Sequence, residues 1–263
     1  MENSIENRVV KIETVRMPNG DEVSFCRERG GIITSIKFKG KEILYLDEAT
    51  LQDPKVNVKG GIPILFPNAG PLSNGLYHLP QHGFARRMPW NVTELNRSSV
   101  TLQLLSNTET REVYPFNFKL ELKVEVAENI LTHSLTINNT GDQPMPTAYG
   151  THPYFNISQE DKPGLITNID GFHPQAINWL AEFDKPFPNP GLINIRMPGK
   201  EITIDTAPDI FKITRIWHQP GQDFICIEPW TRDSFALDHP GQSLWIGPHK
   251  SITLTLTISD KIT

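Results

Sequence analysis

One carboxylate directly follows an uninterrupted apolar stretch of the chain. Residues 224–230 read FICIEPW, so Glu228 comes after four apolar residues and before Pro229. Side chains alternate between the two faces of a strand, and both faces are apolar here, which predicts a central strand covered on each side. Because a proline donates no ladder hydrogen bond, we expect the strand to end at Glu228. Apolar surroundings raise a carboxyl pKa, which suits a general base; the alternative is a solvated glutamate at a strand end.

A histidine stands in a second segment, where residues 149–156 read YGTHPYFN. Pro153 disfavours the helical conformation for His152 and stiffens the loop. Two aromatic residues follow, which supply walls for a site. An imidazole held in this way could donate a proton, or it could be a hydrogen-bonded loop histidine without a catalytic role.

A third segment, residues 60–86, is rich in glycine and proline. It carries His82 between Pro80 and Gly83, with Arg86 a few residues later. Irregular loops on a rigid β scaffold are where binding and catalytic residues concentrate. We therefore expect the site where these three segments lie.

Several familiar catalytic and cofactor motifs are absent from the sequence. It contains no GxSxG nucleophile elbow, no P-loop, no GxGxxG turn and no HExxH pair. No cluster of His, Cys and carboxylates has metal-ligand spacing, so we predict neither a metal nor a cofactor. The alternative is that His82, His152 and Glu228 together bind one zinc ion and leave a coordination position open.

The elements that must position these side chains have a period of two. In residues 118–126 apolar residues alternate with Lys and Glu, and residues 131–137 alternate again after a polar turn at residues 128–129. This pattern predicts two long antiparallel strands, each with one buried face. The same alternation occurs in shorter stretches, at residues 100–104, 202–204 and 252–258.

Helix signals are few, and residues 174–183 are the one stretch whose spacing favours a short helix. The 22 Pro and 18 Gly residues interrupt many short strands, which is typical of a large sandwich or barrel. No repeat and no linker is visible. We therefore predict an all-β fold with a single domain over residues 1–263.

Composition limits the partners and the location. The net charge of −5 argues against a nucleic-acid-binding protein. The longest uncharged stretch, residues 60–85, contains four prolines, which excludes a membrane helix there. The N-terminal residues lack an apolar signal segment, and Cys26 and Cys226 do not look like a disulfide framework. These features favour a cytoplasmic protein that binds a small molecule, as a monomer or a homodimer.

Together the three segments resemble the aldose 1-epimerase, or galactose mutarotase-like, family. The likeness is greatest to its branch of short cytoplasmic sugar-epimerase-like proteins, because residues 60–63 read GGIP and residues 82–86 read HGFAR. Residues 151–155 are similar to the family's segment with the catalytic histidine. Residues 224–230 are similar to its strand with the catalytic glutamate. Order and spacing agree over most of the chain.

The resemblance implies a large antiparallel β-sandwich, the galactose mutarotase-like supersandwich. It also implies interconversion of the α and β anomers of an aldose, which would be a hexose or a hexose 6-phosphate. It assigns the general acid to His152 and the general base to Glu228. It gives His82 a contact with the sugar, and Arg86 a contact with sugar hydroxyls or with a phosphate.

Other expectations concern the walls of the sugar site. Tyr154, Trp230 and Phe84 can pack on the apolar faces of a sugar. Asn74 fits the asparagine of the family's G-R-x-x-N pattern, whereas Pro71 stands where that pattern has arginine.

The resemblance leaves three points open. The family's sugar-binding aspartate corresponds to Asp184 or to Asp209. A non-catalytic carbohydrate-binding protein of the same fold is the alternative function. A glycoside hydrolase is less suitable, because that chemistry usually needs two carboxylates that flank the bond.

Overall fold

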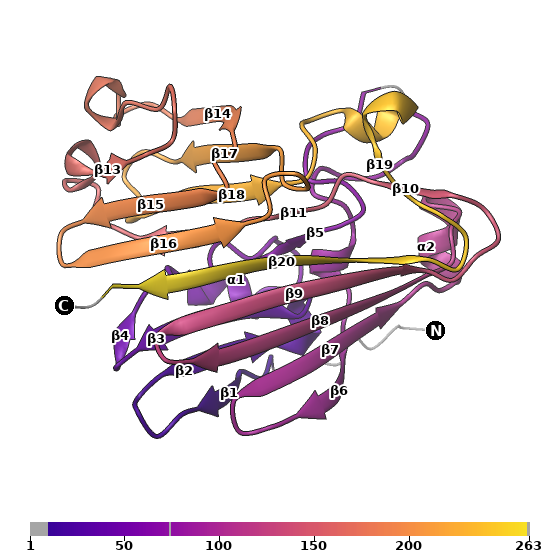
Figure 1. The fold of residues 1–263 in the computed structure, drawn as a ribbon, viewed down its shortest axis with the longest axis horizontal. Helices are drawn as coiled ribbons and strands as arrows, with labels where there is room; N and C mark the ends of the chain where they lie inside the picture. Colours follow the sequence, from indigo (N-terminus) through magenta and orange to yellow (C-terminus); the bar gives the residue numbers. More distant parts are fainter. Residues whose placement is uncertain (1–9, 74, 262–263) are drawn as a thin grey trace.

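The computed structural model describes residues 10–73 and 75–261, and most of its regular elements are strands (Figure 1). The largest sheet has eight strands: β6 (Asn91–Leu95), β7 (Ser99–Leu105), β8 (Phe118–Ala127), β9 (Ile130–Asn139), β13 (Ile166–Thr167), β15 (Leu192–Met197), β16 (Lys200–Thr206) and β20 (Ser251–Asp260). Their order is β13-β15-β16-β20-β9-β8-β7-β6, and every neighbouring pair is antiparallel. The long strands β20, β9, β8 and β7 lie side by side across the molecule (Figure 1).

A second sheet of six strands carries most of the segments that the sequence singled out. Its strands are β5 (Ile64–Leu65), β11 (Gly150–Thr151), β12 (Tyr154–Asn156), β14 (Phe183–Pro188), β17 (Ile213–His218) and β18 (Phe224–Trp230). The order is β14-β17-β18-β11-β5, and β12 also pairs with β18. All seven residues of β18 are buried, which confirms the predicted central strand.

Smaller elements complete the fold. Four strands at the N-terminal end form a sheet: β1 (Glu13–Arg16), β2 (Glu22–Cys26), β3 (Ile32–Phe38) and β4 (Lys41–Glu42). Two further strands pair with each other: β10 (Met145–Thr147) and β19 (Leu244–Ile246). The α-helices of the described chain are short: α1 (Glu48–Gln52) and α2 (Thr108–Val113). Single 3₁₀ turns occur at Arg27–Arg29, Ala85–Arg87, Lys162–Gly164, Pro174–Ala176, Ala236–Asp238 and Pro240–Gln242.

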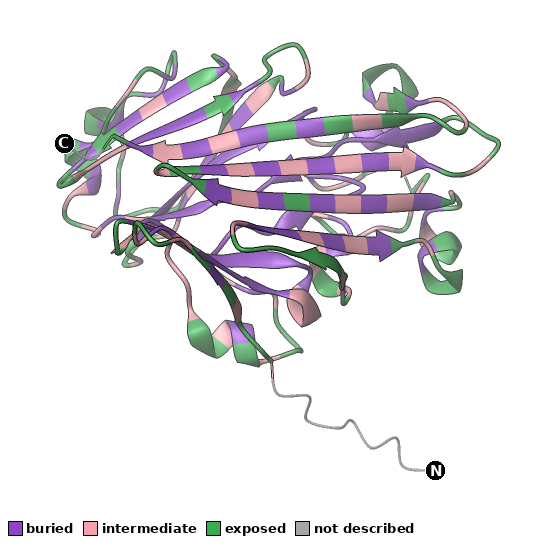
Figure 2. Cartoon of the chain, turned by 60° about the horizontal axis from the view of Figure 1, so that its bottom comes forward, coloured by how far each residue is buried: buried purple, intermediate pink, exposed green. Residues whose placement is uncertain are grey.

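The core follows from the alternation in the sequence. Buried and less buried residues alternate along β8 and β9, as the bands on the large sheet show (Figure 2). The turn between these two strands consists of Glu128 and Asn129, whose φ angles of 52° and 61° give the left-handed turn that suits a tight hairpin. The inward residues of the large sheet pack with those of the N-terminal and six-stranded sheets in one hydrophobic cluster. The predicted all-β, antiparallel sandwich is therefore confirmed.

Two local predictions are wrong. The predicted helix at 174–183 is one 3₁₀ turn that ends at Ala176, because Ile177 is already extended and Leu180 is 86% exposed. The strand also does not end at Glu228, since Pro229 pairs with Thr214 and β18 continues through Trp230. The proline takes a place in the ladder without interrupting it.

Two further predictions concern membrane-spanning segments and disulfide bonds. No helix within the described residues is both long enough and apolar enough to span a bilayer. Cys26 and Cys226 are both buried and free, in agreement with the prediction that they form no disulfide framework.

Candidate active site

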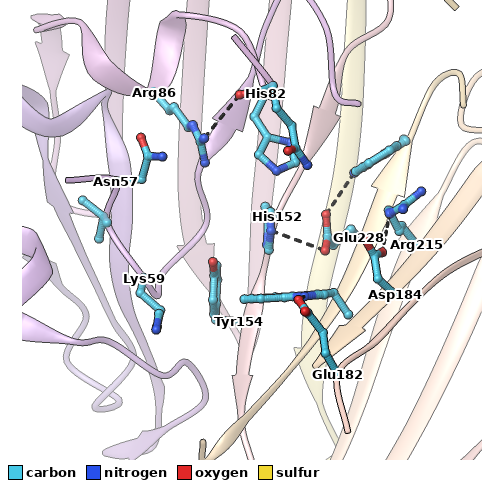
Figure 3. A pocket seen from close by; sticks show the side chains of 14 residues that line it. Asn57, Lys59, His82, Arg86, His152, Tyr154, Glu182, Asp184, Arg215 and Glu228 are labelled. Atoms are coloured by element: carbon cyan, nitrogen blue, oxygen red, sulfur yellow. Dashed lines mark hydrogen bonds and ion pairs between the residues drawn. The ribbon is translucent and has the colours of Figure 1, made fainter. Parts of the chain in front are cut away.

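A pocket of about 420 Å³ opens between the six-stranded sheet and the loops that precede and follow β5 (Figure 3). Strands β12, β14, β17 and β18 supply one part of its wall, and the loop and turn residues at 57–59 and 81–86 supply another. The lining residues are Asn57, Val58, Lys59, Gln81, His82, Arg86, His152, Tyr154, Glu182, Asp184, Arg215, Trp217, Glu228 and Trp230.

His152 and Glu228 meet at the buried end of this pocket. Strand β12 pairs with β18 so that Tyr154 lies opposite Cys226, and the chain just before β12 therefore carries His152 toward Glu228. The distance from His152 Nε2 to Glu228 Oε1 is 3.5 Å, and the two side chains are only 7% and 1% exposed. Residues far apart in the sequence thus form one buried pair of titratable groups.

The environment of Glu228 favours its protonated form. Burial raises the pKa of this carboxyl group well above its usual value, and the negative charge of Asp184 acts in the same direction. Arg215 and the hydrogen bond from Trp230 oppose the shift without reversing it. That hydrogen bond runs from Trp230 Nε1 to Glu228 Oε2 at 3.1 Å and fixes the second carboxyl oxygen.

The environment of His152 favours the neutral imidazole. Its ring stacks on Tyr154 with a centroid distance of 4.7 Å, and the edges of His82 and Trp217 lie nearby. Burial is the main cause that lowers the pKa of His152 well below 6.5, and His82 and Arg86 lower it further. These directions favour a neutral His152 beside a protonated Glu228. This is the reverse of the arrangement with a protonated His152 and an ionised Glu228.

His82 is held by the backbone. Its φ angle is +67°, and its Nδ1 donates a hydrogen bond to the carbonyl oxygen of Ala69. This bond fixes the tautomer with the proton on Nδ1. Burial lowers the pKa of His82 to about 3, with a further contribution from Arg86, so its ring is neutral.

Charged side chains line both sides of the pocket (Figure 3). Arg86 and Lys59 lie on one side, and Glu182 and Asp184 lie on the other, where Arg215 pairs with Asp184. Arg86 donates to the carbonyl of Gln81 at 3.3 Å, while its buried Nε has no hydrogen-bond partner within the described chain. Burial lowers the pKa of Arg86 to about 10, which leaves it charged at neutral pH. The cationic side can therefore accept an anionic group of a ligand.

Comparison with known proteins identifies the family of the chain. The family model for aldose 1-epimerase matches residues 13–177. A Cenchrus ciliaris protein named "Putative glucose-6-phosphate 1-epimerase" is 31% identical, over 88% of this chain and 77% of that protein. The chain belongs to the aldose 1-epimerase family.

Solved structures of similar proteins agree with this assignment. The Slr1438 protein of Synechocystis sp. PCC 6803 is 29% identical and superimposes with a TM-score of 0.89 over 100% of both chains. A galactose mutarotase related enzyme from Lactobacillus acidophilus is 22% identical, with a TM-score of 0.77 over 95% of this chain and 97% of that one. These similarities confirm the predicted galactose mutarotase-like fold.

Apart from Phe84 and the two candidate aspartates, the resemblance and the argument from aromatic rings together named seven site residues. The structure places six of them in the same pocket: His82, Arg86, His152, Tyr154, Glu228 and Trp230. The seventh, Asn74, lies outside the described residues.

The structure also separates the remaining candidates. Asp184 lines the pocket, whereas Asp209 is exposed in the turn before β17. Pro71 is not among the lining residues. Phe84 is not either: its ring packs on Phe66 and Phe118 in the core, so the expectation that it covers a sugar is wrong.

Sequence reasoning missed several lining residues, chiefly Arg215, Trp217 and Lys59. Arg215 and Trp217 are two positions apart on β17 and therefore share a face. Their alternation with Thr214 and Ile216 was visible in the sequence. What the sequence did not reveal is that β17 is the neighbour of β18.

The zinc alternative named His82, His152 and Glu228. In the described chain, the three potential donor atoms that lie within 4.8 Å of one another belong to His152, Cys226 and Glu228 instead. Burial raises the pKa of the Cys226 thiol well above its usual value, and the charge of Glu228 adds to this. Since metals bind the thiolate, a metal ion at this point would have to displace the proton of the Cys226 thiol.

Proposed function

We propose that this chain interconverts the α and β anomers of an aldose, with His152 and Glu228 as the pair that exchanges protons with the substrate. The observation that carries the proposal is the 3.5 Å contact between their side chains at the buried end of a polar pocket. Membership of the aldose 1-epimerase family supports it.

Anomer exchange needs one proton removed and one proton supplied. The hydroxyl oxygen on C1 loses its proton, the ring oxygen gains one, and the bond between C1 and the ring oxygen breaks. The resulting aldehyde turns about the C1–C2 bond, and the same two transfers in reverse close the ring. Both oxygens are bonded to C1, so two neighbouring groups on the protein can serve them.

The pair holds the proton that this reaction requires. Its two tautomers, protonated Glu228 with neutral His152 or ionised Glu228 with protonated His152, carry the same net charge. Each tautomer contains one acid and one base, so either partner can begin a half-reaction. The resemblance assigns the acid to His152 and the base to Glu228, whereas the pKa directions favour the other tautomer. We propose that the proton moves between the partners during each catalytic cycle.

Hexose 6-phosphates are the substrates that the charges of the pocket favour. Arg86 and Lys59 form a cationic side, and Arg86 Nε lacks a partner within the described residues. Guanidinium groups match phosphate oxygens in geometry and charge. Tyr154, Trp217 and Trp230 offer aromatic surface for the apolar faces of the sugar, while Asp184 and Glu182 can accept hydrogen bonds from hydroxyls.

Anomer exchange measured at equilibrium tests the function. Two-dimensional exchange NMR of the anomeric protons, with glucose and glucose 6-phosphate as substrates, reports the rate without a coupling enzyme. We expect catalytic amounts of protein to accelerate exchange, with the larger kcat/KM for the phosphate. His152→Asn should lower the rate by about 10²-fold, whereas the exposed His249→Asn should not.

A non-catalytic sugar-binding protein would give a different result. It would shift the ligand resonances in proportion to its concentration and leave the exchange rate at the spontaneous value for both sugars. That outcome would refute the proposed activity.

A further inference from the structure

Arg215 occupies a position in the pocket that the proton transfers do not use. It lies on β17 directly opposite Glu228 of β18, and both side chains line the pocket (Figure 3). Its Nε donates to Asp184 Oδ1 at 2.5 Å, and its Nη1 donates to Ser234 Oγ at 3.4 Å. Asp184 stands on β14 and Ser234 follows β18, so two separate parts of the chain hold the guanidinium in place.

The guanidinium also lies against the ring of Trp230. Arg215 Cζ is 5.0 Å from the centroid of this indole, within the range of a cation–π contact. The same indole donates its N–H to Glu228 Oε2. The ring is further confined by β11, because a Cβ atom on Gly150 would lie 2.5 Å from Trp230 Cδ1. The indole is thus a rigid link between Arg215 and the Glu228 carboxyl group.

No ion pair within 4.0 Å joins Arg215 to Glu228 in the part of the chain that the structure describes. The guanidinium therefore acts on the carboxyl group through the indole and through space. The charged and titratable groups around Glu228 come from several elements: Asp184 on β14, Arg215 on β17, His152 before β12, Tyr154 on β12, Arg86 in the 3₁₀ turn after β5 and Cys226 on β18 itself. Asp184 raises the pKa of Glu228, while Arg215 and Arg86 lower it.

We propose that Arg215 is a positioning residue: anchored by Asp184, it holds the Trp230 indole so that the indole N–H orients the Glu228 carboxyl group for proton exchange with the sugar. This inference rests on the proposed function. A small misplacement of a reacting group lowers catalysis strongly, because the transfer distance and angle are lost. The anchored guanidinium opposes such a displacement, because the hydrogen bond from Trp230, at 3.1 Å, is shorter than the 3.5 Å contact of the same carboxyl group with His152.

The first test separates kcat from KM. Arg215→Met removes the charged guanidinium and its hydrogen-bond donors but keeps a long apolar side chain. We expect kcat for anomer exchange to fall about 10- to 100-fold, with KM changed less than about threefold. Arg215→Lys keeps a cation beside the indole and should recover most of the loss. The double variant Asp184→Asn with Arg215→Met should have a kcat no lower than that of Arg215→Met alone, because both changes break one unit. Any additional rise of KM in the double variant reports the contact of Asp184 with the sugar hydroxyls.

The second test reads the indole directly and needs no activity. In a ¹⁵N-labelled protein, the Nε1–H resonance of Trp230 is assigned by its absence in Trp230→Phe. We expect this resonance to move or broaden in Arg215→Met and to remain near its wild-type position in Arg215→Lys. Arg196→Met is the matched control, because Arg196 is an exposed arginine on β15 that pairs with Glu201 and lies outside the pocket. It should change neither the resonance nor the rate.

Three results would overturn the inference. In the first, Arg215→Met keeps kcat within about twofold and leaves the Trp230 resonance unmoved. In the second, KM rises while kcat stays constant, which would make Arg215 a substrate-binding residue instead. In the third, Arg215→Lys behaves like Arg215→Met in both tests. If the wild-type protein fails to accelerate anomer exchange, the proposed function fails, and the Trp230 resonance still decides whether Arg215 holds the indole.

Discussion

His152 and Glu228 are displaced from their usual titration ranges by the same cause. Burial penalises the charged form of each group, so the pKa of the imidazole falls and the pKa of the carboxyl group rises. Isolated charges would be costly in this environment, whereas a pair that carries one proton between its members is neutral overall. Such a pair can pass a proton to a substrate and recover it without leaving a net charge in the pocket.

Replacing the carboxyl group tests its part in this exchange. Glu228→Gln keeps the size of the side chain and can still accept a hydrogen bond from Trp230, but it cannot gain or lose a proton. We expect the anomer exchange rate to fall by about 10²- to 10⁴-fold while the affinity for the sugar changes little. Exchange NMR and a ligand titration on the same sample measure both quantities. Glu201→Gln, at a partly exposed glutamate of β16, is the control. Near-normal exchange in Glu228→Gln would show that another residue moves the proton.

The pH dependence of the rate reports the pair as a unit. The active state carries one proton, so activity falls at acid pH when the pair gains a second proton and at basic pH when it loses its last. The pKa of His152 lies well below 6.5, which puts the acid limb below that pH. The pKa of Glu228 lies well above 4.5, which moves the basic limb upward. We therefore expect a bell-shaped profile of kcat/KM with a broad top, measured from about pH 4 to pH 9. A rate that changes in one direction only across this range would contradict the one-proton state.

At the scale of strands, neighbouring elements decide which side chains meet. Strand β18 supplies Glu228 and Trp230, and two of the strands that pair with it bring further site residues: β12 leads back to His152, and β17 carries Arg215. The uninterrupted apolar run of β18 was enough to predict that this strand is central. Alternation of apolar and polar residues was enough to predict the hairpin of β8 and β9, because their turn is local.

Strand β14 pairs with β17, and β17 pairs with β18. No local sequence pattern predicts which strands become neighbours in this sheet. This is why Asp184 and Asp209 were equivalent candidates in the sequence, and why Arg215 was not a candidate at all. The resemblance to a family supplied His82 and Arg86, whose loop carries no alternation from which a neighbour could be inferred. The lowered pKa of His152 depends on burial from all sides and on His82 and Arg86, so it could not be derived from the sequence.

Another buried histidine, in the eight-stranded sheet, makes the folding stability depend on pH. His133 on β9 is fully buried, and its side chain has no hydrogen-bond partner in another described residue. Burial lowers its pKa from 6.5 to about 4. The unfolded chain therefore binds a proton before the folded chain does. The stability that this neutral histidine contributes is complete above pH 6.5 and is lost as the pH falls toward 4.

The substitution His133→Leu removes the loss of folding stability that accompanies protonation of this histidine. We expect the free energy of unfolding to rise by about 1 kcal/mol at pH 7.5, because a buried polar group without a partner is replaced by an apolar one. The variant should also lose less stability than the wild type between pH 7 and pH 5. Urea unfolding at both pH values measures the two effects, and the exposed His249→Gln serves as the control. An equal acid sensitivity in His133→Leu and the wild type would contradict the burial argument.

At the scale of the whole molecule, the requirement for a metal can be tested. The acid–base pair needs none, and the buried thiol of Cys226 next to it is held in its neutral form. We expect dialysis against EDTA to leave the rate of anomer exchange unchanged. Loss of activity that zinc restores would instead favour the His152, Cys226 and Glu228 cluster as a metal site.

The distribution of charge leads to a prediction about substrate capture. The chain carries a net charge of −5, yet one side of its pocket presents Arg86 and Lys59. A phosphorylated sugar is therefore repelled by the molecule as a whole and attracted at the pocket. Exposed charges are screened over about 8 Å at physiological ionic strength, while a contact inside the pocket is screened less.

We expect kcat/KM for a hexose 6-phosphate to change with salt and kcat/KM for the free hexose to stay nearly constant, since only the first carries charge. If the local attraction dominates, salt lowers the value for the phosphate. Arg86→Gln should then reduce kcat/KM for the phosphate about 10-fold or more and weaken its salt dependence, while affecting the free hexose less. Exchange NMR at several salt concentrations with both sugars measures these values. Equal losses for both sugars in Arg86→Gln would place Arg86 on the sugar hydroxyls instead, the other contact that the resemblance implies.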